Sequence, residues 1–401
     1  MGNGFRLIKL FGINIDIDWS WLLIFILVTW NLAGGVFPSI HPNWTTGQDI
    51  SIGLLASFLF FGSVVAHELA HSLVANAQGV PVRRITLFLF GGVSNIQREP
   101  ASPSDEFLMA FVGPLTSIVL GIIFLGVGLA AGATNILSAF RDPLQALAGL
   151  NPLATLLLWL GPVNISLGVF NLIPGFPLDG GRVLRSIIWG ITRDLKVATR
   201  WASWVGQVIA WGFIIAGISM FFGVSIPLLG TGFINGLWLA FIGWFLNNAA
   251  VQSYKQLVVR DALEGIPVSR LMQRSPVTIS PNLTVSQLVD EYIMGTDERS
   301  FPVMQNDLLM GIVTLEDVRK VPRGEWDRNT VSQIMTPKEK LQTISPGDDA
   351  ADAMEVFNRH EFRQLPVIQD GQLVGVLRRR DILRWIQLQS DISAHNRQQS
   401  D

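Results

Sequence analysis

The sequence predicts a polytopic α-helical membrane protein with six transmembrane helices and a small cytoplasmic-side β-sheet, followed by a soluble α/β region. Three observations support this fold class. Hydrophobic residues make up 49% of the 401 residues and charged residues only 15%, against about 25% charged residues in soluble domains. The charge is uneven, because residues 1–252 carry 21 charged side chains and residues 253–401 carry 39. Finally, the first part contains six apolar runs of spanning length.

These six runs follow one another along the first 252 residues. A helix needs about 20 apolar residues to cross the hydrocarbon core of a bilayer. Runs of about that length cover residues 19–37, 52–76, 107–131, 153–173, 203–222 and 231–250. We therefore expect a transmembrane domain over residues 1–252, a charged linker over 253–264 and a soluble region after it. The net charge of −2 gives no case for nucleic acid as a partner.

The distribution of basic residues predicts how the spans are oriented. Six spans place both chain termini on one side of the membrane. The loops on that side carry twelve Lys and Arg residues, from Arg6 to Arg260, whereas the opposite loops carry only Arg141. Loops rich in Lys and Arg stay in the cytoplasm. We therefore expect both termini, the 77–106 and 174–202 loops and the soluble region to be cytoplasmic.

Two stretches on the predicted cytoplasmic side have the pattern of strands. Apolar and polar residues alternate in residues 13–18, and residues 81–98 form two short β-type runs around Gly91 and Gly92. Alternation with a period of two is typical of half-buried strands. These stretches predict the small sheet at the cytoplasmic end of the helices.

The second span contains the run His67-Glu68-Leu69-Ala70-His71. Residues four apart lie on one face of a helix, so both imidazoles can hold one zinc ion, and Glu68 lies beside it as a candidate base for water. The alternative is a buried polar group that only ties helices together. Ionisable side chains inside a span are costly and by default mark a functional site, which favours the metal.

The sequence also suggests a third ligand. Catalytic zinc usually has three protein ligands and one open position. Cysteine is absent, and His41, His360 and His395 lie on the outer side or in the soluble region, which leaves a carboxylate. Asp179 follows the fourth span in a segment rich in proline and glycine. Irregular backbone at membrane depth lines protein or a wet cavity, so we predict Asp179 as the third ligand; a simple turn aspartate is the alternative.

The HELAH run and the NLIPGFPLDG run resemble the two signature motifs of the site-2 proteases, a family of intramembrane zinc metalloproteases. The resemblance covers roughly residues 1–250. It implies that His67, His71 and Asp179 bind one zinc ion and that Glu68 is the general base. It also implies that Asn171 positions the substrate or stabilises the oxyanion.

By this resemblance the protein is an intramembrane zinc endopeptidase of a prokaryotic cell (inner) membrane. Its partners are then the lipid bilayer and membrane-anchored proteins, such as an anti-sigma factor or another regulator, which it cuts in or near a transmembrane segment. An unwound substrate segment could pair with the 81–98 hairpin or the 13–18 strand by strand addition. If so, proline at Thr86 or Phe88, expected on an edge strand, should reduce proteolysis.

Two other classes of function remain open. Charged residues and broken helices also mark transport paths, so a transporter or channel gated by the soluble region is the main alternative. The other is a regulatory scaffold that has lost catalysis. The complete set of His67, His71 and Asp179 argues against the transporter, and the intact Glu68 argues against the scaffold, which has no use for a base.

The soluble region contains an internal repeat over residues 265–386. Three matched pairs of residues each lie 64 positions apart: Pro302 and Pro366, Gly311 and Gly375, and Asp317 and Asp381. Each copy combines short β-branched runs with a helical stretch. A fixed period of this kind indicates duplicated structural units, here of α/β type.

This repeat resembles a tandem CBS (cystathionine-β-synthase) pair, which we place at residues 265–324 and 325–388, with a disordered tail at 389–401. Such pairs often bind an adenine nucleotide in a cleft between the domains. The resemblance implies that Asp317 and Asp381 contact ribose and Thr314 a phosphate, whereas Arg378 replaces the usual Ser or Thr in the second copy. Helix capping by the two aspartates is the alternative. We expect the pair to sense a nucleotide or to mediate homodimerisation.

Overall fold

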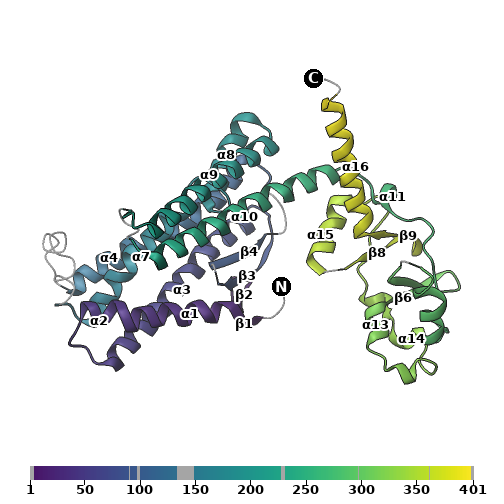
Figure 1. Cartoon of the computed structure of the whole chain (residues 1–401), viewed down its shortest axis with the longest axis horizontal. Coiled ribbons are helices and arrows are strands. Elements are labelled where there is room, and N and C mark those ends of the chain that lie inside the picture. Colours follow the sequence, from purple (N-terminus) through teal and green to yellow (C-terminus); the bar gives the residue numbers. More distant parts are fainter. Residues whose placement is uncertain are drawn as a thin grey trace. The chain divides into compact units, whose positions relative to one another are not determined.

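The computed structural model describes residues 4–89, 91–96, 100–132, 149–226, 231–296, 298–360 and 362–398. The chain divides into two compact units, Met1–Lys255 and Gln256–Asp401, of which the first is a helical bundle with a small sheet and the second an α/β unit (Figure 1). Arg141, the single basic residue of the predicted outer loops, lies outside the described residues.

Among the described residues, six helical segments are long and apolar enough to cross a membrane. The first combines α1 (Trp19–Asn31), η1 (Leu32–Val36) and α2 (Phe37–Ile40). The others are α3 (Thr46–Ala77), α4 (Pro103–Gly132), α7 (Pro152–Asn171), α9 (Leu195–Phe221) and α10 (Phe233–Leu263). Each of the six predicted spans overlaps one of these segments, which confirms the multi-pass helical fold. A shorter helix, α8 (Asp179–Thr192), joins α7 to α9.

A four-stranded sheet lies at the end of the bundle where α1 begins and α3 ends. Its order is β1 (Gly4–Leu10), β2 (Ile13–Asp18), β3 (Val82–Phe88) and β4 (Gly91–Ile96). β2 and β3 pair in parallel, and the other two pairs are antiparallel. The sheet expected from residues 13–18 and 81–98 is therefore present. β1 was not predicted, because its side chains are nearly all exposed and show no alternation.

The position of each strand in the sheet corrects one expectation. β1 folds back on β2 through a tight turn in which both Phe11 and Gly12 have positive φ, as in two-residue hairpins. β2 therefore has a neighbour on each side, and so has β3, which carries Thr86 and Phe88. The prediction that the 13–18 strand could accept a further strand, and that Thr86 and Phe88 lie on an edge, is wrong. β4, the second strand of the hairpin expected over residues 81–98, is an edge strand of the sheet.

The second unit repeats one supersecondary pattern, a hairpin followed by a helix. The first copy has β5 (Ser300–Gln305), β6 (Leu308–Thr314) and α13 (Leu315–Arg319), and the second has β8 (Gln364–Gln369), β9 (Gln372–Arg378) and α16 (Arg379–Gln398). Before the hairpins lie α12 (Val285–Gln287) with η2 (Leu288–Ile293) and α15 (Ala350–His360). The remaining elements are α11 (Val268–Leu271), α14 (Val331–Ile334), β7 (Thr336–Pro337) and the short turns η3 (Arg323–Glu325) and η4 (Lys338–Lys340).

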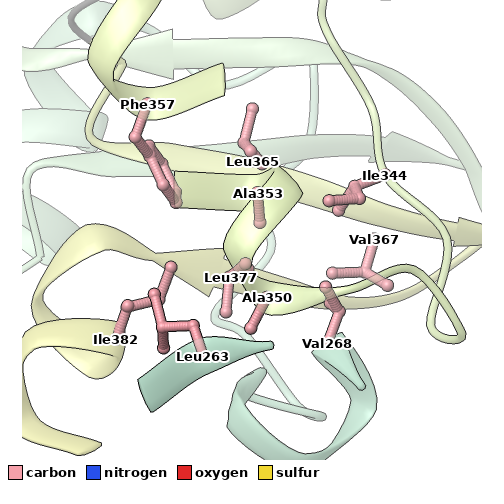
Figure 2. Packing of buried hydrophobic residues seen from close by; sticks show 10 residues of the cluster. All are labelled: Leu263, Val268, Ile344, Ala350, Ala353, Phe357, Leu365, Val367, Leu377 and Ile382. Atoms are coloured by element: carbon pink, nitrogen blue, oxygen red, sulfur yellow. The ribbon is translucent and has the colours of Figure 1, made fainter. Parts of the chain in front are cut away.

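The two copies exchange their first short helices. Val268 of α11 packs with Phe357 and Val367 in the core of the second copy, together with Leu263 from the end of α10 (Figure 2). In return, Val331 of α14 packs in the core of the first copy with the strand residues of β5 and β6. The division expected between residues 324 and 325 separates the two sequence repeats. The hydrophobic core of each repeat, however, includes a short helix from the other repeat.

The segments expected as a charged linker and as a disordered tail are both helical. α10 continues to Leu263, so it contains nearly all of the expected linker 253–264. α16 continues to Gln398 through most of residues 389–401, where a disordered tail was expected. The physical reason for the second difference is in the sequence, because no proline or glycine follows Gly375. Polar residues without a helix breaker can extend a helix that has already started.

Candidate functional site

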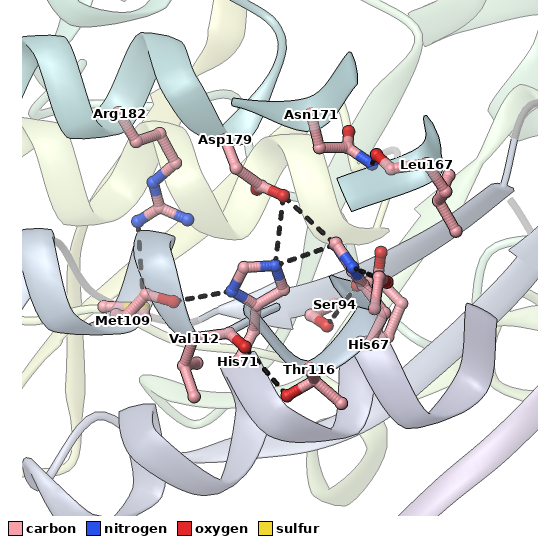
Figure 3. Close-up of polar contacts among 12 residues, drawn as sticks. His67, His71, Ser94, Met109, Val112, Thr116, Leu167, Asn171, Asp179 and Arg182 are labelled. Carbon is pink, nitrogen blue, oxygen red and sulfur yellow. Dashed lines mark hydrogen bonds and ion pairs between the residues drawn. The ribbon is translucent and has the colours of Figure 1, made fainter. Parts of the chain in front are cut away.

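The structure brings together His67, His71 and Asp179, the three predicted metal ligands. The histidines lie one turn apart in α3, and Asp179 is the first residue of α8. Asp179 Oδ2 lies 3.1 Å from His67 Nε2 and 3.2 Å from His71 Nε2, and the two Nε2 atoms are 3.1 Å apart (Figure 3). Both histidines are buried. Two imidazole nitrogens and one carboxylate oxygen therefore converge on one point inside the bundle.

The other nitrogen of each imidazole is held by α4. His71 Nδ1 lies 2.6 Å from the carbonyl oxygen of Met109, to which its N–H donates, and His67 Nδ1 lies 2.9 Å from Ser117 Oγ. A hydrogen bond at Nδ1 fixes the ring orientation and leaves Nε2 facing the metal position, which is the usual outer support of a metal-binding histidine. Sequence reasoning missed both partners, because one is a main-chain atom and the other a single serine within a span.

The helix that supports the histidines also makes room for them. A Cβ atom at Gly113 of α4 would lie 2.1 Å from His71 Nε2, far closer than van der Waals contact permits. Met109, Gly113 and Ser117 are spaced by four residues, so they lie on one face of α4. That face thus supplies a carbonyl acceptor, an open space and a hydroxyl to the two histidines.

A buried ion pair fixes the helix that carries Asp179. Glu106 of α4 is fully buried and bonds the guanidinium of Arg185 on α8, with a contact of 2.7 Å to its Nε. Arg182, also on α8, approaches the same carboxylate at 3.6 Å. α4 therefore contacts both sides of the site, the histidines directly and Asp179 through the α8 backbone. The sequence showed Glu106 and Arg185 as charged residues near span ends but gave no sign that they pair.

Glu68 lies next to His67 and faces the sheet. Its Oε2 accepts a hydrogen bond of 2.9 Å from Ser94 Oγ of β4. A Cβ atom at Gly92, two residues earlier on β4, would lie 2.3 Å from Glu68 Cγ. The carboxylate is thus held from the strand side, beside the point where the three ligand atoms converge.

Asn171 ends α7, and its amide donates a 3.0 Å hydrogen bond to the carbonyl oxygen of Leu167 in the same helix. This bond leaves its side-chain oxygen available for other partners. Figure 3 shows Asn171 on the α7 segment beside the start of α8, so it lies in the same region of the bundle as Asp179.

The three ligand atoms suit a zinc ion. Catalytic zinc takes nitrogen and oxygen ligands at about 2.0–2.1 Å in tetrahedral geometry with one position open, which separates neighbouring donor atoms by about 3.3 Å. The separations of 3.1 to 3.2 Å among His67, His71 and Asp179 are close to this value. Among the described residues, these three are the group of His, Asp and Glu side chains assembled closely enough to hold a metal ion.

In the second unit, Thr314 and Asp317 line a cavity of about 340 Å³. Thr314 Oγ1 donates to Asp317 Oδ2 at 2.7 Å, and Lys320 Nζ lies 2.9 Å from Asp317 Oδ1. The hydrogen bond to the Asp317 carboxylate raises the pKa of Lys320 above its usual value. The cavity is lined by residues of both copies, and its basic members are Arg299, Arg319, Lys320, Lys340 and Arg363. These five outnumber the acidic lining residues, Glu316 and Asp317, and this excess of positive charge suits an anionic ligand.

The equivalent position in the second copy is arranged differently. Arg378 occupies the place of Thr314 and binds Asp381 with two hydrogen bonds, of 2.7 and 3.0 Å. Its Nη1 also lies 2.5 Å from Glu298 Oε1, which Arg380 contacts as well. Asp381 is therefore paired with Arg378 through both of its carboxylate oxygens, whereas Asp317 bonds Thr314 and Lys320. The two matched aspartates thus differ in their surroundings.

Comparison with known proteins finds a family match in each of the two units. Residues 55–213 match the model of peptidase family M50, and residues 268–324 and 331–388 match the CBS domain. The chain is 36% identical to sll0528 of Synechocystis sp. over 96% of both chains, and 32% identical to Rip3 of Mycobacterium tuberculosis over 94% of this chain and 91% of that one. Both relatives carry names that refer to zinc metalloproteases.

A solved structure also resembles the chain. It is the site-2 protease of Methanocaldococcus jannaschii, with 27% identity and a TM-score of 0.41 over 63% of this chain and 95% of that one. Given the match over nearly the whole length of its relatives, this chain belongs to peptidase family M50 and is a multi-pass membrane metalloprotease of the site-2 type with a C-terminal CBS pair.

Proposed function

We propose that the protein is an intramembrane zinc endopeptidase that hydrolyses peptide bonds in or near the transmembrane segments of membrane-anchored proteins. The observation that carries this proposal is the convergence of His67 Nε2, His71 Nε2 and Asp179 Oδ2 within the bundle, with the Glu68 carboxylate beside them. His67, His71 and Asp179 are the zinc ligands in this proposal, and Glu68 is the general base.

Each residue has a defined task in this chemistry. Zinc held by the three ligands would polarise the scissile carbonyl and lower the pKa of water. Glu68 accepts the proton of the attacking water and transfers it to the nitrogen of the leaving amine. Asn171, at the end of α7, presents its amide oxygen, or the N–H that Leu167 does not accept, to the unwound substrate backbone. The Met109 and Ser117 contacts keep the imidazoles in place throughout.

The substrate class follows from the location of the site. A soluble protein cannot reach a buried site between α3, α4 and α8, whereas a membrane-anchored chain shares the bilayer. The excess of Lys and Arg in the loops on their side supports a cytoplasmic location for the sheet, both termini and the CBS pair, and the proposed cut then lies near the cytoplasmic face of a prokaryotic inner membrane. Release of an anchored regulator, such as an anti-sigma factor or another regulatory protein, is a task that such a cut performs.

The edge strand β4 is the surface we propose for the unwound substrate. A peptide that adds to a sheet edge gains main-chain hydrogen bonds. β4 is close to the proposed base, because its Ser94 hydroxyl donates a hydrogen bond to the Glu68 carboxylate. Val93 of β4 is 53% exposed. Val93→Pro should reduce cleavage while zinc binding persists. Unchanged cleavage by this variant would contradict the docking of substrate on β4.

Zinc content and cleavage together test the proposed function. The protein, purified in detergent, should hold about one zinc per chain, which His67→Ala and Asp179→Ala should lose. Glu68→Gln should keep the zinc and lose cleavage of a doubly tagged single-span reporter with a glycine-rich break in its membrane segment. A wild-type protein without zinc, or a Glu68→Gln variant that cuts normally, would overturn the assignment and favour a transporter or scaffold.

For the CBS pair we propose a single adenine nucleotide in the cavity lined by Thr314 and Asp317, with a regulatory role. The basic lining residues suit its phosphates, and in this proposal Thr314 contacts one of them and Asp317 contacts the ribose. We assign no corresponding role to Asp381, because it is not among the residues that line this cavity and Arg378, at the position of Thr314, bonds both of its carboxylate oxygens. Calorimetry of the purified full-length protein with ATP, ADP and AMP tests this proposal. Absence of heat with all three nucleotides would leave homodimerisation as the role of the pair.

A further inference from the structure

The edge strand β4 and the proposed general base are in direct contact. Ser94 Oγ donates to Glu68 Oε2 at 2.9 Å. Ser94 Oγ also lies 3.1 Å from Ser72 Oγ, and the Ser72 hydroxyl donates at 2.8 Å to the main-chain oxygen of Glu68. Ser94 therefore approaches one turn of α3 at two points, at the carboxylate of Glu68 and at the hydroxyl four residues further along.

The same face of β4 also limits where the carboxylate can go. Residues two apart on a strand point to the same side, so Gly92 and Ser94 both face α3. A side chain at Gly92 would collide with Glu68 Cγ and Cδ, at 2.3 and 2.9 Å from a Cβ atom. The strand thus leaves space for the Glu68 side chain at Gly92 and holds its end with the Ser94 hydroxyl.

The register of the sheet makes this arrangement possible. Ser94 pairs with Ile85 of β3, and Gly92 pairs with Leu87, both of which are buried. A shift of one residue would turn Ser94 away from Glu68 and bring the exposed Val93 to that side. The position of the hydroxyl is thus fixed by the buried strand next to it, and it does not depend on a mobile side chain reaching across a gap.

We propose that Ser94 is a positioning residue, which holds the Glu68 carboxylate in the orientation that water activation requires. The proposal rests on the proposed catalytic role of Glu68. Because β4 also forms the edge on which the substrate is proposed to pair, one strand would hold the base and align the peptide. Pairing of a substrate strand would then order β4, which bears Ser94, and align the Glu68 carboxylate with the scissile bond.

A set of three variants tests the proposal with the full-length protein in detergent and the single-span reporter. Ser94→Ala should lower kcat by about 10- to 100-fold, the range expected for a lost hydrogen bond to a charged group, with KM and zinc content unchanged. Ser94→Thr keeps the hydroxyl and should restore most of the activity. Ser57→Ala removes a buried hydroxyl of α3 that bonds Thr29 and Gly53, and it should leave kcat unchanged.

The outcomes separate this inference from the proposed function. A Ser94→Ala variant with wild-type kcat, in a protein that Glu68→Gln inactivates, would overturn the positioning role alone. Loss of activity in both Ser94→Ala and Ser94→Thr, together with loss of zinc, would also overturn it, because the serine would then be a general structural residue. A Glu68→Gln variant with normal cleavage would overturn the proposed function itself.

Discussion

The Nδ1 atom of His71 lies 2.6 Å from the carbonyl oxygen of Met109. This contact joins the helix that carries the HExxH run to the next transmembrane helix, and it orients Nε2 toward Asp179. A main-chain acceptor cannot be removed by a side-chain substitution, so the orientation of His71 depends on the packing of α3 against α4. The arrangement of the metal position is therefore a property of three helices, α3, α4 and α8.

Gly113→Ala should remove most of the zinc-binding capacity. Its Cβ would lie 2.1 Å from His71 Nε2, so either the imidazole or α4 must move. We expect the zinc affinity to fall by at least about 10- to 100-fold, as when outer partners of a metal ligand are changed. Competition with a chromogenic zinc chelator measures this affinity. Gly126→Ala is the matched control in the same helix, because nothing lies within 4 Å of its Cβ position.

Glu106→Gln should destabilise the membrane unit. It leaves Arg185 buried without its carboxylate partner, and breaking a buried ion pair costs about 3–5 kcal/mol. Because Arg185 lies on the helix of Asp179, zinc affinity should fall as well. Thermal unfolding in detergent, with and without zinc, reports both effects. Asp105→Asn changes the neighbouring carboxylate, which bonds Ser102 near the surface, and a similar loss of stability in this control would argue against the ion pair.

Gly92→Ala should lower kcat and leave zinc bound. The new methyl group would contact Glu68 Cγ at 2.3 Å and displace the carboxylate from its place beside the ligands, whereas the ligand atoms themselves lie elsewhere. Zinc analysis and reporter cleavage on the same sample distinguish these effects. Val93→Ala, at the exposed neighbouring position, should retain full zinc and most of the activity. Zinc loss in Gly92→Ala would show that β4 supports the metal position and not the base alone.

Removal of the metal should lower the melting temperature of the wild-type protein. A ligand that binds the folded state at 100 times its Kd stabilises that state by about 2.7 kcal/mol. A chelator should therefore shift the thermal transition downward, and added zinc should restore it. His67→Ala should melt at the lower temperature under both conditions. A chelator effect of equal size in this variant would place the stabilising metal elsewhere in the chain.

Asp317→Ala and Asp381→Ala should differ in nucleotide binding. Asp317 lines the 340 Å³ cavity, whereas Asp381 is bonded to Arg378. Calorimetry with the full-length protein should show one nucleotide per chain in the wild type, loss of binding in Asp317→Ala and retention in Asp381→Ala. Two nucleotides per wild-type chain, or loss in Asp381→Ala, would show that the second cleft also binds.

The sequence by itself determined the local features. The length of the apolar runs predicted six membrane helices, since a bilayer requires about 20 residues, and the four-residue spacing of His67 and His71 placed both on one helix face. Exclusion of cysteine and the other histidines, together with the irregular segment after the fourth span, led to Asp179, which the structure places against both histidines. Each of these results follows from a period, a length or a composition that can be read from the linear sequence.

Only the tertiary structure decided which distant residues support the site and which strands are edges. The contacts of Met109, Ser117 and Ser94, and the close approach of Gly113 to His71, join segments far apart in sequence and leave no periodic signal. The same reason explains why the interior positions of β2 and β3, and the exchange of α11 and α14 between the CBS copies, were not predicted. Local patterns specify helices and strands, whereas packing between them depends on the whole folded chain.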